Sequence, residues 1–173
     1  MANEQRFRML FVCTGNSARS IMAEYLLRDL APRRFETFSA GSEPKGEVNP
    51  LALKVLEKVY RIDTAGARSK PLTTYQDNTF DFVITVCDRA RESCPIWPGQ
   101  PIVAHWGMED PAAVEGTPEE KLRAFKRAAI EIRRLLELFI NLPFEKLNGL
   151  RLQEATQEIG QTENPGRTPW AQQ

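Results

Sequence analysis

The chain has 173 residues, and its 23 basic and 23 acidic side chains give a formal net charge of zero. No block of like charge stands out, which argues against general attraction to nucleic acid or to a membrane surface and favours a small partner. The length fits one ordinary domain. No apolar run approaches a membrane span and the first residues lack a signal-peptide core, so we expect a cytoplasmic protein.

The first part of the chain alternates strands and helices. An apolar run over residues 6–12 predicts a buried strand, and the periodic run 18–30 predicts an amphipathic helix. Residues 35–40 alternate apolar and polar side chains, as a second strand does. A second helix is predicted from Pro50 to about Tyr60.

The second part continues the alternation. Residues 80–86 and 101–106 are predicted as the third and fourth strands. A long helix is predicted over 118–142, with Thr117 as its cap. This order predicts an α/β fold: a single domain with a four-stranded parallel sheet and helices on both faces, of the flavodoxin-like doubly wound kind.

The end of the chain differs from the rest in composition. We expect the domain to cover residues 1–142 and residues 143–173 to form a polar extension that is partly disordered. Residues 157–173 are polar and contain glycine and proline, so this tail is expected to be mobile.

A reactive segment follows the first predicted strand and leads into the first helix: Cys13, Thr14, Gly15, Asn16, Ser17, Ala18, Arg19 and Ser20. The loop N–H groups, the positive helix end and the Arg19 guanidinium would bind an oxyanion, and their field also favours a thiolate at Cys13. The loop lacks the Walker and dinucleotide glycine patterns. A single cysteine at the end of a buried strand is more often a small core residue than a nucleophile. The complete run of residues 13–20, however, indicates that Cys13 is a nucleophile.

Two further cysteines, Cys87 and Cys94, flank a polar segment after the third strand. If that segment is helical, they lie about 10 Å apart along its axis, whereas a disulfide needs α-carbons within about 7 Å. They could pair only if the segment bends or unwinds, which would make their oxidation a conformational switch. Arg89 and Arg91 would favour thiolates there. The alternative, a core residue at Cys87 and a surface thiol at Cys94, stays open.

Asp110 precedes Pro111 shortly after the fourth strand. An Asp at such a place is either a turn former or, on the rim of an active site, a general acid or base. The segments that begin at Cys13, at Cys87 and just after Trp106 all follow a predicted strand end. Because active sites of parallel sheets lie at the carboxyl ends of strands, these segments are expected to converge.

The single histidine, His105, is interpreted as a hydrogen-bonded core or rim residue rather than a catalyst. Together with the three cysteines it could in principle bind zinc. Structural zinc ligands usually come in closely spaced pairs, which are missing here, so no metal is expected. The cysteine spacing does not resemble the disulfide framework of a small secreted protein either.

Taken together, the loop 13–20, the pair Cys87 and Cys94, and Asp110 with Pro111 closely resemble the arsenate reductases related to low-molecular-weight protein tyrosine phosphatases. The similarity extends over about residues 6–142. A phosphatase of this family needs only the loop and the acid, so the two further cysteines favour the reductase. The resemblance implies the phosphatase-like fold, a role in arsenic detoxification and no cofactor.

The resemblance also implies roles for the loop residues. Cys13 would attack arsenate while Arg19 and the amides from Thr14 to Ser20 hold its oxygens. Ser20 would support the thiolate, and Asp110 would protonate the departing oxygen.

The other cysteines would complete a cascade. Cys87 would attack Cys13 and release arsenite, and Cys94 would then attack Cys87, which moves the disulfide to the surface of a rearranged segment. Thioredoxin would reduce it there, with glutathione and glutaredoxin as a variant route.

The sequence departs from the related families at three positions. Phosphatases usually carry a second cysteine where Ala18 stands and an aromatic residue where Ala112 stands, which disfavours phosphotyrosine as the natural substrate.

Some related reductases bind potassium through residues that correspond to Asn16, Glu24 and Ser39 plus an aspartate. Lys70 stands at that last position, and its ammonium could replace the ion, so no potassium requirement is expected.

Two other functions stay open. One is a low-molecular-weight tyrosine phosphatase or another phosphomonoesterase that uses Cys13, Arg19 and Asp110. The other is a non-catalytic module that binds arsenic or an oxyanion through its thiols.

Overall fold

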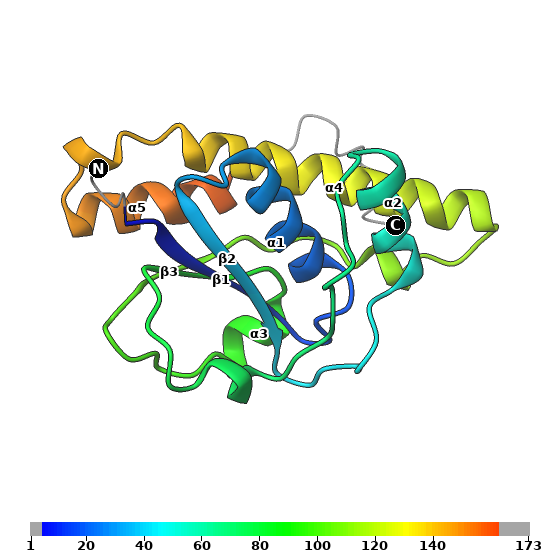
Figure 1. The fold of residues 1–173 in the computed structure, drawn as a ribbon, viewed down its shortest axis with the longest axis horizontal. Coiled ribbons are helices and arrows are strands. Elements are labelled where there is room, and N and C mark those ends of the chain that lie inside the picture. The colour runs from blue at the N-terminus through cyan, green and yellow to red at the C-terminus, as the bar shows by residue number, and fades with distance from the viewer. Residues whose placement is uncertain (1–4, 163–173) are drawn as a thin grey trace.

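The computed structural model describes residues 5–162. Its sheet contains β1 (Phe7–Cys13), β2 (Phe35–Gly41), β3 (Phe82–Thr85) and β4 (Ile102–His105) in the order β2-β1-β3-β4. All neighbouring strands pair in parallel, with Cys13 opposite Gly41 at the carboxyl end of β1. This architecture confirms the predicted α/β fold (Figure 1).

The five α-helices have the bounds α1 (Arg19–Leu30), α2 (Pro50–Lys58), α3 (Asp88–Ser93), α4 (Pro118–Ile140) and α5 (Gly149–Gly160). The short 3-10 helices are η1 (Leu72–Tyr75), η2 (Pro111–Ala113) and η3 (Phe144–Lys146). The predicted cap Thr117 is confirmed, and it forms a capping box because Thr117 and Glu120 each accept the other's backbone N–H. None of the helices described is long and apolar enough to cross a membrane.

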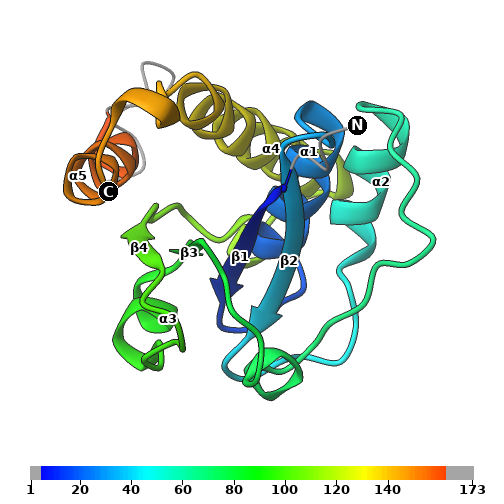
Figure 2. The same cartoon turned by 60° about the vertical axis from the view of Figure 1, so that its left-hand side comes forward.

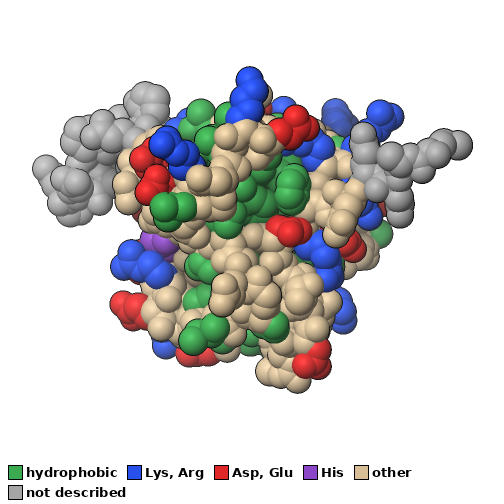
Figure 3. Space-filling view, turned by 90° about the vertical axis from the view of Figure 1, so that its left-hand side faces the viewer, with side chains coloured by type: hydrophobic (Ala, Val, Ile, Leu, Met, Phe, Trp, Pro, Cys, Tyr) green, Lys and Arg blue, Asp and Glu red, His purple; other side chains and the backbone are tan. Residues whose placement is uncertain are grey.

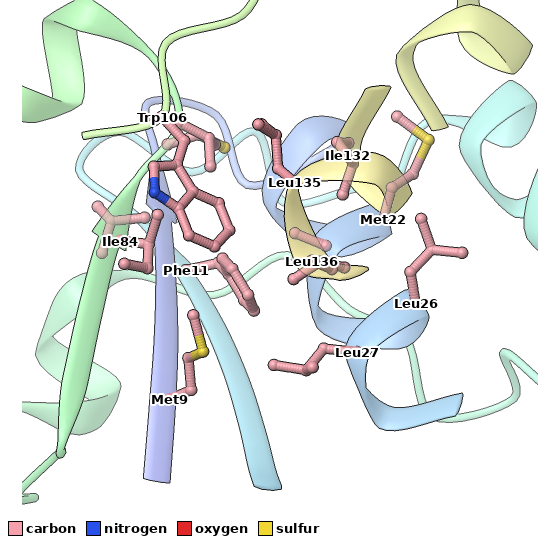
Figure 4. Packing of buried hydrophobic residues seen from close by; sticks show 14 of the residues in the cluster. Met9, Phe11, Met22, Leu26, Leu27, Ile84, Trp106, Ile132, Leu135 and Leu136 are labelled. Carbon is pink, nitrogen blue, oxygen red and sulfur yellow. The ribbon is translucent and has the colours of Figure 1, made fainter. Parts of the chain in front are cut away.

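One face of the sheet packs against α1 and α4. Met9 and Phe11 of β1 point toward these helices, and Leu136 of α4 belongs to the same buried cluster (Figure 4). Trp106 belongs to the same layer and packs edge-on against Phe139. These side chains are fully buried, so this layer is the main hydrophobic core.

The other face is covered by α3 and by aromatic side chains. Leu10 and Phe38 are paired across β1 and β2 and lie on the face opposite Met9, because successive strand residues alternate between faces. Phe38 contacts Phe80 edge-on, and Phe80 contacts Trp97 in the same way. Helices therefore lie on both faces, as the sequence predicts.

The segment after residue 142 is more ordered than expected. Residues 149–160 form α5, which lies along the outer edge of β4 (Figure 2). Gln153 accepts the backbone N–H of Val103 and donates to its carbonyl, as a neighbouring strand would. Leu152 and Ile159 are buried, so apolar contacts add to these bonds. The expected mobility from Gln157 is therefore wrong for the rest of this helix, and residues 163–173 lie outside the described part of the chain.

Candidate active site

The loop between β1 and α1 is fixed by buried hydrogen bonds. Asn16 has a backbone φ of 43°, and its side chain donates to Ser20 Oγ at 2.8 Å. The side-chain oxygen Oδ1 of Asn16 accepts the backbone N–H of Lys70 at 2.8 Å. Asn16 and Ser20 are fully buried, so a change at either position would leave polar atoms without partners. The sequence predicts this cradle, and the structure shows that Asn16 joins it to the segment at Lys70.

The end of β2 supports the loop from below. A Cβ atom on Gly41 would lie 2.5 Å from the carbonyl oxygen of Thr14 and 3.0 Å from the Asn16 backbone nitrogen. Such distances are too short for any side chain, so the backbone of the loop approaches β2 because Gly41 has none. The position of Gly41 at the strand end explains why the sequence places a glycine there.

Cys13 lies at the base of the loop, where its sulfur is 2.8 Å from Ser20 Oγ and 3.1 Å from the backbone nitrogen of Asn16. Burial raises the pKa of the Cys13 thiol, whereas the bonds from Ser20 and Asn16 and the charge of Arg19 lower it. Burial is the largest of these effects, while Ser20, Asn16 and Arg19 act in the direction that the sequence analysis expects, toward the thiolate. Ser20, Asn16 and Arg19 therefore reduce the free-energy cost of ionising the Cys13 thiol.

Arg19 and Asp110 meet on the rim. The Arg19 guanidinium donates to the backbone carbonyl of Met108 at 2.9 Å, and its other terminal nitrogen lies 3.8 Å from an Asp110 carboxylate oxygen. The second Asp110 oxygen accepts the backbone N–H of Ala112 at 3.0 Å. Asp110 therefore forms a turn and also faces the pocket, so the two interpretations of this residue are compatible.

Cys87 stands in the wall of the same pocket. Its sulfur lies 3.3 Å from Thr14 Oγ1, so a hydroxyl of the loop contacts the second thiol. Cys94 is half-buried at the opposite end of α3, where burial raises the pKa of its thiol. Cys13, Cys87 and Cys94 are all free thiols. The structure thus brings Cys87 to the loop and separates Cys94 from Cys87 by one short helix.

A pocket of about 590 Å³ is lined by the loop residues 13–19, by Cys87 and by Asp110, whereas Ser20 and Cys94 do not line it. Three lining residues were not identified from the sequence: Asp88, which begins α3, and the pair Glu43 and Lys45. Glu43 and Lys45 follow the carboxyl end of β2, and the backbone N–H of Lys45 donates to Gly15 at 2.9 Å. The signal that could have found them is their position, because polar residues just after a parallel strand lie at the edge that carries the site.

The residues considered for potassium form one buried group beneath the loop. Ser39 donates to Glu24 at 2.5 Å, and the Lys70 ammonium lies 4.0 Å from the same carboxylate. Burial lowers the pKa of Lys70, while Glu24 raises it. Within residues 5–162, no three His, Cys, Asp or Glu side chains are grouped as a metal site would need.

Known proteins share this fold and much of this sequence. Residues 8–142 match the family of low molecular weight phosphotyrosine protein phosphatases. An arsenate reductase from Shouchella clausii is 40% identical over 129 residues, which cover 75% of this chain and 91% of that protein.

Solved structures of two kinds resemble the chain. A thioredoxin-dependent arsenate reductase from Corynebacterium glutamicum is 31% identical, with a TM-score of 0.55, 80% of this chain covered and 65% of that one. A low molecular weight protein tyrosine phosphatase from T. tengcongensis is 28% identical, with a TM-score of 0.65, 82% of this chain covered and 99% of that one. The fold is thus common to a reductase and a phosphatase, and the side chains of the site have to distinguish them.

Proposed function

The chain belongs to the low molecular weight phosphotyrosine protein phosphatase family, and from this we propose that it is an arsenate reductase that uses three cysteines in turn. The observation that carries the proposal is the position of Cys87. Its sulfur contacts Thr14 in the wall of the pocket whose base is Cys13. A phosphatase does not need a second thiol there, whereas a reductase does.

Arsenate binding follows from the loop and its arginine. The loop amides and the Arg19 fork are placed to hold the oxygens of a tetrahedral anion. The Cys13 sulfur attacks arsenic, and one arsenic–oxygen bond breaks as Asp110 gives a proton to the departing oxygen, which leaves as water. The product is arsenic(V) bound to the sulfur of Cys13.

The reduction step needs the second thiol. Cys87 attacks the sulfur of Cys13, and the electron pair of the sulfur–arsenic bond stays on arsenic, which leaves as arsenite. A Cys13–Cys87 disulfide forms, so two thiols supply the two electrons that arsenic gains. Phosphorus in the same position is not reduced in this way, and a phosphorylated cysteine would instead be hydrolysed.

The third thiol, Cys94, regenerates the free Cys13 thiolate. Cys94 attacks Cys87, Cys13 departs as a thiolate, and a Cys87–Cys94 disulfide remains. The two residues cap opposite ends of α3, so this helix has to unwind before their sulfurs can bond. The new disulfide would then be reduced by a dithiol protein.

We propose thioredoxin as that reductant, because the related Corynebacterium enzyme is thioredoxin-dependent. A glutaredoxin route has no comparable support. A thioredoxin-coupled enzyme fits a reducing compartment, which supports a cytoplasmic location. We also assign residues 1–142 to the catalytic domain, supported by the family match that ends at residue 142, with residues 143–173 as an extension.

A phosphomonoesterase is the second candidate, and the related tyrosine phosphatase structure favours it. It would use Cys13, Arg19 and Asp110, all of which line the pocket. Ala18 and Ala112 stand where phosphatases carry a cysteine and an aromatic residue, which weakens this candidate. A binding module without turnover remains the third.

The deciding experiment measures arsenate-dependent NADPH oxidation with thioredoxin and its reductase, alongside hydrolysis of para-nitrophenyl phosphate. Wild type is compared with Cys13→Ser, Cys87→Ser and Cys94→Ser. The cascade predicts multiple turnovers for wild type, no arsenite from Cys13→Ser or Cys87→Ser, and one arsenite per molecule from Cys94→Ser.

Other results would contradict the proposal. Ester hydrolysis that needs only Cys13, without arsenate turnover, would identify a phosphatase. Stoichiometric arsenic binding without either reaction would identify a binding module.

A further inference from the structure

The first turn of α3 is held by a contact that the cascade does not use. Asp88 is the first residue of α3 and directly follows Cys87. Its carboxylate lies 2.8 Å from Nε2 of His105, the last residue of β4. The Asp88 side chain is 79% exposed, while that of His105 is 13% exposed, and part of the imidazole reaches the surface (Figure 3). The largely buried His105 ring thus contacts the N-terminal end of α3 through Nε2.

Three neighbours fix the His105 ring and backbone. Nδ1 of His105 lies 2.8 Å from the Thr85 hydroxyl. In the tautomer in which Nδ1 accepts the hydroxyl hydrogen, Nε2 carries the ring proton and donates it to Asp88. A Cβ atom on Gly107 would lie 2.7 Å from Nε2, so that glycine leaves room for the ring. The His105 backbone N–H donates to Gln157 of α5 at 3.0 Å. His105 is therefore held by β3 and α5, whereas its partner Asp88 has an exposed side chain.

The other contacts of α3 are weaker or apolar. Arg89 pairs with Glu43 at 3.4 Å, but these side chains are 71% and 67% exposed, so water screens the pair. Ala90 is fully buried against the sheet. The Asp88–His105 hydrogen bond is thus the polar contact that ties the beginning of α3, beside Cys87, to the sheet.

We propose that His105 is a positioning residue that acts through Asp88: it keeps α3 helical, so that Cys87 stays beside Thr14 and does not pair with Cys94 before arsenate is reduced. The inference rests on the proposed cascade. Residues 87 and 94 are about 10 Å apart along a helix axis, and a disulfide needs α-carbons within about 7 Å. Any contact that resists unwinding therefore slows direct pairing of Cys87 with Cys94.

The test uses the full chain with Cys13→Ser and no arsenate. Hydrogen peroxide oxidises Cys87 and Cys94: the two thiols lose two electrons and two protons, one disulfide forms, and the peroxide becomes two waters. The rate of disulfide formation is measured by mass spectrometry after alkylation. Since one hydrogen bond is lost, Asp88→Ala and His105→Ala are each expected to raise this rate about three- to tenfold.

Matched variants separate positioning from general loosening. Glu92→Gln removes another exposed carboxylate of α3, for which the structure shows no bond, and should leave the rate unchanged. Asp88→Asn keeps an acceptor for His105 and should stay near the rate of the Cys13→Ser parent, as should His105→Gln, which keeps a donor. The double Ala variant should react no faster than either single variant, because both remove the same contact.

Several outcomes would overturn the inference: unchanged rates in both single variants, multiplied effects in the double variant, or an Asp88→Asn rate as high as that of Asp88→Ala. If His105→Ala does not fold, the exposed Asp88 variants still decide. If the Cys13→Ser parent forms the disulfide and the Asp88 and His105 variants made in it do so no faster, only this inference fails. If no protein forms it, the cascade fails as well.

Discussion

The catalytic loop and the α3 segment face each other across one pocket, but they are held very differently. In the loop, Asn16 and Ser20 are fully buried and bonded to each other. In α3, Ala90 is the fully buried residue, and the other side chains of this six-residue helix are exposed. The loop is thus fixed by the interior, whereas α3 is fixed mainly at its ends.

The difference corresponds to the order of the chemistry. A loop that binds an anion gains most when its donors are already in place, because no reorganisation is then needed during the reaction. A segment that has to unwind needs few buried contacts, since each one would add to the cost of opening. We call the loop 13–20 the rigid wall of the pocket and α3, which the proposed cascade requires to unwind, its mobile wall. Substitutions should affect the two differently.

The largest effect is expected from Gly41→Ala, because the added methyl group displaces the backbone of the rigid wall. The new methyl group would meet the Thr14 carbonyl and the Asn16 backbone, which are not flexible. We expect a loss of about 1–3 kcal/mol in the free energy of unfolding and a fall of about a hundredfold in kcat/KM for arsenate, because the loop is displaced. Thermal unfolding and steady-state kinetics check both.

Gly66→Ala is the control, since its methyl group would meet only the Tyr25 hydroxyl at an ordinary 3.8 Å. Equal effects at Gly41 and Gly66 would show that the loop tolerates movement and would contradict the comparison.

Ser20→Ala should have the next largest effect. The Ser20 hydroxyl lowers the pKa of Cys13 against the effect of burial, so its removal raises that pKa further. Less thiolate forms at neutral pH, and we expect kcat/KM to fall about tenfold there. The acidic limb of the pH–rate profile should move to higher pH, with activity partly recovered in alkaline buffer.

Ser42→Ala is a control outside the pocket lining. A uniform loss at every pH in Ser20→Ala would mean that the hydroxyl positions the sulfur without assisting its ionisation.

A smaller effect is expected at Lys70, which lies with Glu24 and Ser39 in the buried group beneath the loop. Its ammonium lies beside Glu24, so wild-type rates should be the same in sodium and potassium chloride. Lys70→Gln removes the charge and leaves the carboxylate facing space that a cation could fill, so we expect potassium to activate this variant. Initial rates in the two salts at equal ionic strength measure the effect. Strong potassium activation of the wild-type enzyme would contradict the proposal that the Lys70 ammonium takes the place of a potassium ion.

The smallest effect is expected from Arg89→Ala on the mobile wall. Its pair with Glu43 is exposed, so kcat/KM should change by less than about threefold. Glu43→Ala should behave in the same way, and the change should shrink as salt is added. A large loss in Arg89→Ala alone would mean that this guanidinium contacts arsenate.

The sequence predicts the sheet and the loop well because both depend on local patterns. The apolar run that ends at Cys13 and the polar loop after it determine a strand end and an anion cradle without long-range information. The convergence of Cys87 and Asp110 on that loop follows from the general position of active sites in parallel sheets. The structure shows the strand end at Cys13 and the three segments around one pocket, and anion binding by the loop stays a prediction.

Other features depend on contacts between distant segments. The order of α5 depends on Gln153 and Val103, which are 50 residues apart. The raised pKa of Cys13 depends on how completely the fold buries the sulfur, which no motif reveals. The contact of Thr14 with Cys87 joins residues 73 apart and is also invisible in local patterns. The sequence therefore identifies the reacting groups better than their environment.

The glutamine contact on β4 has a consequence for self-association. An open edge strand can recruit a strand from another molecule, and proteins avoid this by covering the edge. Here Gln153 occupies the backbone N–H and C=O of Val103, so this position of the outer edge cannot pair with another strand. A chain cut at Leu142 would keep the proposed catalytic residues but expose that edge. We therefore expect the shortened chain to aggregate, although its reacting groups are unchanged.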